Sequence, residues 1–324
     1  NPGDRIMNRR QFLAASAAVT ALAASQPEET PSVFPVVDTH QHLWDLGKFR
    51  LPWQKNEPKL AKNHLMADYL AATADLGKVG NLPARIVKTV YMEVDVDPVQ
   101  QTAEAEYVLD LCGRADNPMV AAVVSGQPNS EGFAKYLDRF KNSACVKGIR
   151  QVLHGPNTPA GYCLDKKFIR GIRLLGERDL SFDLCMRPGE LLDGAKLIDE
   201  CPDTRFILDH CGNGDVQAKD RSQWEKDIAV VAKRKQVVCK VSGIVVTAKP
   251  ERWTADDLVP IVKHTLEVFG PDRVMFGGDW PVCTKTATFQ QWFQALASIV
   301  RDRSAEEQRN LFHDNAVRFY RLEE

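Results

Sequence analysis

Eight short apolar runs alternate with eight amphipathic segments along most of this 324-residue chain. The runs are rich in Val and Ile and cover residues 36–42, 86–94, 119–126, 145–152, 180–186, 205–211, 237–243 and 273–279. Helical periodicity extends over residues 65–76, 99–113, 132–141, 166–178, 190–200, 223–235, 255–269 and 288–303. Strands that alternate with crossover helices form a parallel sheet, and eight repeats of this unit close into a barrel.

An open, doubly wound sheet is the alternative architecture for this alternation. It is disfavoured because no glycine-rich phosphate loop follows the first apolar run. We therefore predict an α/β fold, a (β/α)8 TIM barrel, and assign residues 35–324 to that single domain. The segment 306–322 is expected to form an extra C-terminal helix packed on the outside of the barrel.

The N-terminal residues differ in kind from the rest of the chain. Asn8-Arg9-Arg10-Gln11-Phe12-Leu13 precedes a run of small and apolar residues at 14–24, which is too short to span a bilayer. This pattern is typical of a twin-arginine signal peptide, here at residues 1–25 with a linker at 26–34, and it predicts a periplasmic or otherwise exported protein. An alanine-rich N-terminal helix is the alternative.

The charges and cysteines narrow the expected partners. The 42 basic and 43 acidic residues are scattered, with a formal net charge of -1, so nucleic acid and anionic membrane surfaces are not indicated. A small-molecule substrate is expected, and the oligomeric state stays open. The eight cysteines form no CxxC pair and lie in or beside apolar runs, which predicts buried packing thiols and no disulfide framework.

Polar residues at the predicted strand ends form a candidate catalytic group. His40 and His42 are two residues apart and so share one face of a strand, while His210 and Asp279 close the sixth and eighth runs. The carboxyl ends of all strands meet on one face of a barrel, so these four side chains are expected to converge. Imidazoles and a carboxylate can hold a zinc-like ion and its water, and the carboxylate can serve as general base.

A second group of residues is expected to contact the substrate. Lys147 and Arg150 lie within the fourth run, where a long cation is costly to bury without a partner, so carboxylate recognition is weighed against a structural ion pair. The long loop at 43–63 follows the two histidines, and such loops commonly shape a pocket. The substrate-binding candidates are Lys147, Arg150, Trp44, His154, Trp280 and Glu93.

Other polar residues are weaker candidates for the functional site. Asp183, Arg187 and Ser242 also fall at predicted strand ends. His64, His264 and His313 fall on predicted helices and are expected to be structural. Each catalytic candidate has a plainer alternative as well: the histidines as hydrogen-bonded core residues and Asp279 as a turn residue before Trp280.

Four sequence blocks carry a family resemblance. They are Asp38-Thr39-His40-Gln41-His42-Leu43-Trp44-Asp45, Val146-Lys147-Gly148-Ile149-Arg150, Leu208-Asp209-His210-Cys211-Gly212 and Met275-Phe276-Gly277-Gly278-Asp279-Trp280-Pro281-Val282. In this order the chain resembles the amidohydrolase-related family over about residues 36–320. Its sugar-lactonase branch, with L-fuconolactonase, L-rhamnonolactonase and the related 2-pyrone-4,6-dicarboxylate lactonase, is the most similar.

The resemblance implies a barrel hydrolase that opens a sugar-acid lactone. Asp279 would deprotonate the attacking water, and His40, His42 and His210 would bind metal or polarise the carbonyl. Binuclear relatives carry a histidine on the fifth strand, which the run at 180–186 lacks, so two metals are not expected; one divalent ion or none are both left open. Amide hydrolysis, metal-dependent decarboxylation and a non-catalytic metabolite-binding barrel are the alternative functions.

Overall fold

The computed structural model of this chain describes residues 33–322. The predicted signal peptide at 1–25 lies outside the described residues, as does the predicted linker up to residue 32. The last linker residue, Phe34, already belongs to the first strand.

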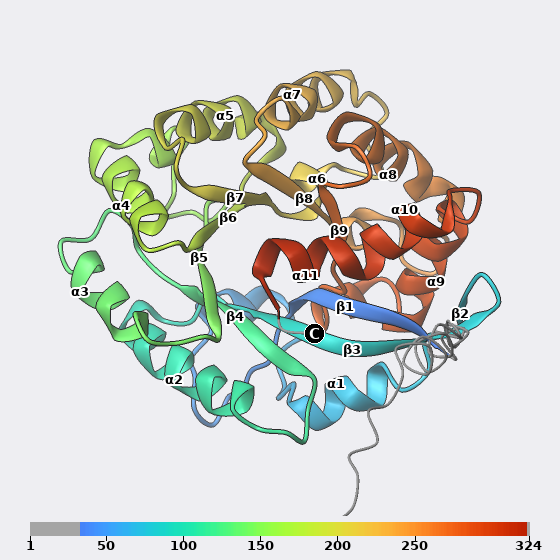
Figure 1. Cartoon of the computed structure of the whole chain (residues 1–324), viewed down its shortest axis with the longest axis horizontal. Coiled ribbons are helices and arrows are strands. Elements are labelled where there is room, and N and C mark those ends of the chain that lie inside the picture. The colour runs from blue at the N-terminus through green and yellow to red at the C-terminus, as the bar shows by residue number, and fades with distance from the viewer. Residues whose placement is uncertain (1–32, 323–324) are drawn as a thin grey trace, which may run out of the picture. The chain divides into compact units, whose positions relative to one another are not determined.

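Eight parallel strands form a nearly closed ring, which confirms the predicted TIM barrel (Figure 1). In spatial order they are β1 (Phe34–Gln41), β3 (Leu82–Met92), β4 (Met119–Ser125), β5 (Val146–Val152), β6 (Ser181–Cys185), β7 (Arg205–Leu208), β8 (Val237–Val241) and β9 (Val274–Phe276). The ring is completed beyond the short β9, where Asp279 N donates to His40 O at 2.8 Å and His42 N donates to Trp280 O at 2.8 Å. This closure places the ends of β1 and β9 side by side.

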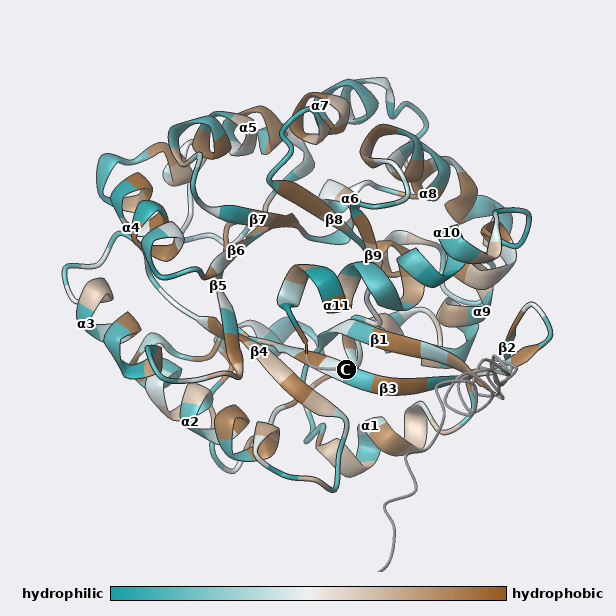
Figure 2. Ribbon diagram, in the orientation of Figure 1, coloured by the Kyte–Doolittle hydropathy of each residue, from teal (hydrophilic) through white to brown (hydrophobic). Residues whose placement is uncertain are grey.

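An outer layer of helices surrounds the strands (Figure 1). It comprises α1 (Met66–Ala72), α2 (Gln101–Cys112), α3 (Phe133–Leu137), α4 (Lys166–Glu177), α5 (Leu191–Glu200), α7 (Ser222–Ala232), α8 (Ala255–Phe269) and α9 (Phe289–Ile299). Side-chain caps set several starts: the Asp165 carboxylate accepts the N–H of Lys167 at 2.8 Å, and Thr254 opens a capping box. Figure 2 shows apolar residues along most of the strands and both apolar and polar residues on the outer helices, as expected for helices with one buried and one exposed face.

The predicted C-terminal helix is present in three parts. These are α10 (Ala305–Arg309), a π-helical turn η8 (Asn310–Asp314) and α11 (Asn315–Tyr320). Instead of lying on the outer wall, α11 crosses one end of the barrel (Figure 1), and Tyr320 and Leu322 are buried in one cluster with Val37 and Val90 of β1 and β3. The helix therefore closes the amino-terminal end of the strand ring.

One short strand and one short α-helix were not predicted. The strand β2 (Lys78–Val79) forms an antiparallel hairpin with β3, and α6 (His210–Asn213) is a single turn directly after β7. Among residues 33–322, no helix combines the length and the apolar character that a membrane span requires.

The prediction for the cysteines was wrong at two positions. Cys112 at the end of α2 and Cys145 just before β5 form a disulfide, although 33 residues separate them in the sequence. The cause is topological: the chain returns to the amino-terminal end of the barrel after each helix, so these two positions become neighbours. The other six cysteines are buried free thiols, as expected.

Candidate active site at the carboxyl ends of the strands

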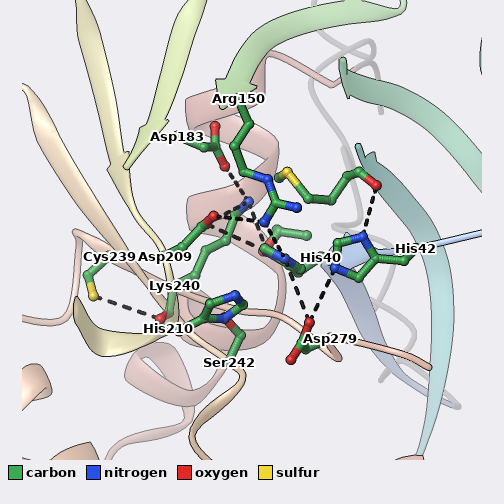
Figure 3. A network of polar contacts seen from close by, with 12 residues as sticks. His40, His42, Arg150, Asp183, Asp209, His210, Cys239, Lys240, Ser242 and Asp279 are labelled. Carbon is green, nitrogen blue, oxygen red and sulfur yellow. Dashed lines mark hydrogen bonds and ion pairs between the residues drawn. The ribbon is translucent and has the colours of Figure 1, made fainter. Parts of the chain in front are cut away.

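Three imidazoles and one carboxylate meet at the carboxyl end of the barrel (Figure 3). The ring centre of His40 lies 4.9 Å from that of His42 and 4.5 Å from that of His210. Asp279 Oδ1 is 3.3 Å from His42 Nε2 and 3.8 Å from His40 Nε2. The structure thus brings together the four side chains chosen from the strand ends, while their catalytic roles stay predictions.

Several non-glycine residues at this rim adopt the left-handed backbone conformation, which residues other than glycine rarely adopt. His210, Cys211 and Asn213 have φ values of 54°, 52° and 55°, and Asp279 has a φ of 53°. Each left-handed residue costs about 1–3 kcal/mol, and such strain collects where a side chain must be aimed at a site. Two of the four candidate catalytic residues, His210 and Asp279, are held in this way.

Glycines make room for the histidine and the aspartate. A Cβ at Gly243, whose φ is 66°, would collide with the His210 ring. A Cβ at Gly278 would collide with Phe289 and with the Asp38 carboxylate, which accepts the N–H of Gly278 at 2.7 Å. The Gly277-Gly278 pair therefore lets β9 approach β1 closely enough to present Asp279 beside His40 and His42.

The tautomer of His42 follows from its partner. His42 Nδ1 lies 3.0 Å from the carbonyl oxygen of Met92, and because a carbonyl only accepts, Nδ1 carries the proton. In the neutral ring, Nε2 then presents its lone pair to Asp279 Oδ1, so two acceptors face one another. Because two lone pairs repel, this arrangement is favourable only with a proton or a cation between the two atoms.

This donor set fits a single metal ion. One ligand atom each of His40, His42 and Asp279 lies within 4.8 Å of the others, and all three residues are buried. A second set, His40, Asp209 and His210, meets the same distance limit. Imidazole and carboxylate donors at this spacing are typical of zinc sites.

Charged groups surround both nitrogens of His40. Arg150 Nη1 is 3.3 Å from Nε2, while Lys240 Nζ at 3.4 Å and Asp209 Oδ1 at 3.5 Å face Nδ1. Burial lowers the pKa of His40 well below its usual value, and the Lys240 charge adds to this while Asp209 opposes it. His40 is therefore a neutral ring held between two cations.

A buried network of ion pairs lies inside the barrel, next to the histidines of the rim. Lys240 Nζ, fully buried inside the barrel, lies 2.6 Å from Asp183 Oδ2 and 3.4 Å from Asp209 Oδ1. Burial pushes the pKa of Asp209 upward, but Lys240 and His40 outweigh it and hold that pKa well below the usual range. Burial raises the pKa of Asp183 to about 7 despite its bond to Lys240.

Arg150 links this network to a second group of carboxylates. Its Nε lies 2.6 Å from Glu93 Oε1, its Nη2 donates to Glu93 O at 2.8 Å, and its Nη1 lies 3.4 Å from Asp209 Oδ2. Behind Glu93, the buried Glu104 accepts hydrogen bonds from Tyr91, Val94 and Ser125. Of the two roles weighed for Arg150, the structure shows the ion pair, with Nη1 directed at His40.

Two further residues from the strand ends join the group. His210 Nδ1 lies 2.9 Å from Ser242 Oγ, which follows β8, and burial lowers the pKa of His210. His154 lies in the loop after β5, and desolvation of its ring, followed by the charges of Arg150 and His210, lowers its pKa to about 4. His154 therefore lies at the edge of the site.

Other sequence-predicted residues lie elsewhere. Lys147 is excluded from the rim because its Nζ donates to Arg321 O at the opposite end of the barrel, near the start of β5. Trp44 and Trp280 are buried, and the ring of each contacts the ring of the buried His64. Arg187 pairs with Glu190 in the loop after β6.

Asp209 and Lys240 are site residues that sequence reasoning did not select. Lys240 could have been found, since it is a lone cation inside the apolar strand Val237–Val241 and a buried cation demands partners. Asp209 adjoins His210, but its contact with His40 is visible only in the folded barrel.

Comparison with known proteins gives a consistent picture. A family model described as Amidohydrolase matches residues 37–322. An L-fucono-1,5-lactonase of Burkholderia multivorans is 26% identical across 89% of this chain and 96% of that protein. An L-rhamnono-gamma-lactonase of Scheffersomyces stipitis is 21% identical across 90% of this chain and 100% of that protein. The crystal structure of an amidohydrolase from Burkholderia multivorans with bound zinc has a TM-score of 0.76 at 24% identity, over 89% of this chain and 99% of that one.

Proposed function

This chain belongs to the amidohydrolase family and is a hydrolase, and from that premise we propose that it opens a cyclic ester, a sugar-acid lactone, by attack of water on the ring carbonyl. The observation that carries the proposal is the Asp279 carboxylate, 3.3 Å from His42 and 3.8 Å from His40 on the barrel rim. The lactonases with which the chain aligns over nearly their full length support the substrate class.

In the proposed reaction Asp279 acts first as base and then as acid. Its carboxylate takes a proton from water as the water oxygen bonds to the carbonyl carbon. The positive charge of the Arg150 guanidinium, whose Nη1 lies 3.3 Å from His40 Nε2, stabilises the developing oxyanion. When the ring C–O bond breaks, Asp279 returns the proton to the leaving alkoxide, and the product is an open-chain hydroxy acid.

We further propose that His40, His42 and Asp279 hold no more than one divalent ion. When bound, such an ion polarises the carbonyl and lowers the pKa of water. The zinc in the similar Burkholderia multivorans structure supports a zinc-like ion. Single occupancy is supported by β6, the strand on which two-metal relatives are expected to carry a further histidine, because its residues Ser181–Cys185 include no histidine and Asp183 Oδ2 is paired with Lys240.

Export is also a proposal, based on the Asn8-Arg9-Arg10 pattern. The Cys112–Cys145 disulfide supports it, because disulfides persist mainly in oxidising compartments. Fractionation of cells that express the full chain tests this. The matched variant Arg9→Lys/Arg10→Lys should stay in the cytoplasm, and equal export of both forms would contradict a twin-arginine signal.

The function is tested with a panel of aldonolactones assayed by proton release. Wild-type protein should open at least one, and Asp279→Asn should lose turnover by about 10³-fold or more while its thermal unfolding stays close to wild type. Product mass separates the alternatives, because lactone opening adds one water while decarboxylation loses carbon dioxide. Wild-type turnover in Asp279→Asn would remove the mechanism, and binding without conversion would identify a non-catalytic barrel.

A further inference from the structure

Asp95 and His154 are two polar residues at the carboxyl end of the barrel. Asp95 lies just after β3, and His154 lies in the loop after β5. Within the described part of the chain, neither side chain makes a hydrogen bond or an ion pair with another residue. Polar atoms without a protein partner are hydrated in the free protein, and a ligand can bind them in place of that water.

The backbone around Asp95 is fixed from two sides. Glu93 Oε2 accepts the N–H of Asp95 at 2.6 Å, and Trp53 Nε1 donates to Val94 O at 2.8 Å. Asp95 has a φ of 48°, a left-handed conformation that persists only where the surrounding structure imposes it. Val94 and Val96 on either side are buried, whereas Asp95 is accessible to solvent. This turn therefore presents the Asp95 side chain to solvent at the rim.

Asp95 is connected to the proposed active site through Glu93 and Arg150. Arg150 Nε lies 2.6 Å from Glu93 Oε1, and Arg150 Nη1 lies 3.3 Å from His40 Nε2. Partial desolvation and the charge of Glu93 raise the pKa of Asp95 to about 6, while the charge of Arg150 acts in the opposite direction. Asp95 is therefore close enough to Arg150 to interact with its charge, and at pH 7 its carboxyl group is mostly ionised.

Arg187 fixes the loop that carries His154. Its Nη1 donates to Leu153 O and to Thr158 O, each at 3.0 Å, and its Nη2 donates to Gly155 O at 2.8 Å. Desolvation lowers the pKa of the His154 ring to about 4, so the ring is neutral at pH 7 and offers one donor and one acceptor. The backbone at His154, like that at Asp95, is held in place before a ligand arrives, which lowers the entropy cost of binding.

The two side chains offer the hydrogen-bonding groups that hydroxyls require. An ionised carboxylate only accepts hydrogen bonds and can accept from two neighbouring hydroxyl groups, while a neutral imidazole can donate one bond and accept one. A lactone derived from a sugar acid carries several hydroxyl groups, whereas a plain cyclic ester carries none. Hydrogen bonds to a charged acceptor are stronger than those between neutral groups, so Asp95 contributes more than His154 to the discrimination.

We propose that Asp95, together with His154, binds hydroxyl groups of the substrate and thereby selects polyhydroxylated lactones over plain cyclic esters. This inference rests on the proposed lactonase function and adds specificity-determining residues to it. In that function Asp279, His40 and His42 act at the ring carbonyl, whereas Asp95 and His154 bind other parts of the ring.

The selectivity is measured as the ratio of kcat/KM for the aldonolactone that wild type opens fastest to kcat/KM for δ-valerolactone, which has no hydroxyl groups. Asp95→Asn keeps the size of the side chain and tolerates a positive φ, but it removes the charge. We expect the ratio to fall by about tenfold or more, chiefly through a higher KM for the aldonolactone. Asp95→Gly, which suits the left-handed conformation, gives the same test should Asp95→Asn not fold. His154→Ala should lower the ratio by a smaller factor.

The matched control is Asp110→Asn, which removes an exposed carboxylate on α2 and should keep the wild-type ratio. An unchanged ratio in the Asp95 variants, or a fall of equal size in the control, would overturn the inference. An unchanged ratio in His154→Ala would overturn the part assigned to His154.

A binding measurement separates this inference from the proposed function. D-Glucono-δ-lactam keeps the hydroxyl groups of an aldonolactone on a ring that resists hydrolysis, and δ-valerolactam lacks them. In calorimetry, wild type should bind the hydroxylated lactam more tightly, and Asp95→Asn should weaken that binding by about tenfold or more. If wild type opens no lactone, the proposed function fails and this measurement decides the inference. Weaker binding in Asp95→Asn then supports it, while unchanged binding, or no binding by wild type, overturns it.

Discussion

The ammonium nitrogen of Lys240 lies 2.6 Å from a carboxylate oxygen of Asp183, and both side chains are fully buried inside the barrel. The same nitrogen is 3.4 Å from Asp209 and 3.4 Å from His40 (Figure 3). A strand residue in the barrel interior thus contacts one of the histidines of the rim. The His40 imidazole is therefore positioned by an ion network and not only by its own strand.

Removing one partner of the buried Lys240–Asp183 pair should destabilise the protein far more than removing both. Lys240→Met should destabilise the protein by about 3–5 kcal/mol, since it leaves buried carboxylates without their cation. Lys240→Met/Asp183→Leu should recover most of that loss. Urea unfolding of the two variants measures the difference, and equal destabilisation in both would show that the pair is not energetically coupled.

Arg150→Lys should impair the reaction more than the fold. Lysine keeps the charge but cannot place donors on Glu93 Oε1, on Glu93 O and beside His40 at once. We expect kcat for the lactone substrate to fall by about 10²-fold or more with a smaller change in KM. Arg173→Lys, at an exposed pair with Glu200, is the control; a similar loss there would exclude a specific role.

Glu104 should make stability depend on pH. Burial, together with the charge of Glu93, raises its pKa to about 7 in the folded state, against 4.5 ordinarily. The folded state therefore holds the proton more tightly, and stability should decline between about pH 5 and 8 by up to about 3 kcal/mol. Glu104→Gln should flatten this decline, because a neutral amide can keep the bond to Ser125.

The control for that experiment is Glu106→Gln, an exposed position on the same helix. The urea midpoint of Glu106→Gln should change with pH as that of wild type does, whereas the midpoint of Glu104→Gln should change less. A wild-type profile that rises from pH 5 to 8, or a Glu104→Gln profile with the wild-type slope, would contradict the assignment.

Loss of the Cys112–Cys145 disulfide should lower stability by about 3 kcal/mol, since the bond closes a loop with a sequence separation of 33 residues. Cys112→Ser/Cys145→Ser should unfold at a lower denaturant concentration than oxidised wild type. Reductant should lower the unfolding midpoint of wild type and leave that of the double variant unchanged. If reductant lowered the midpoint of the double variant by the same amount, it would act on a group other than this disulfide, which would contradict the prediction.

Metal binding can be tested without any substrate. Zinc added to metal-stripped protein should raise the thermal unfolding midpoint, because a ligand that binds the folded state stabilises it. His42→Ala should abolish this shift, since it removes one of three donors. His154→Ala, at the exposed edge of the site, should keep it; loss of the shift in both variants would argue against the His40, His42 and Asp279 set.

Local sequence determined the architecture and part of the site. Apolar runs with a period of two and segments with a helical period dictate strands and helices wherever they occur, so the barrel and its helices could be predicted, with α8 placed at the predicted residues. His40, His42, His210 and Asp279 could be chosen because each ends an apolar run, and barrel topology gathers such ends on one face.

Tertiary structure alone decided which residues surround those four. Lys147 and Arg150 belong to the same strand, yet one reaches Arg321 at the amino-terminal end and the other His40 at the rim. The pairing of Lys240 with Asp183 and the disulfide between Cys112 and Cys145 join residues far apart in the chain. Their energies depend on distance and burial in three dimensions, which periodicity along a sequence does not encode.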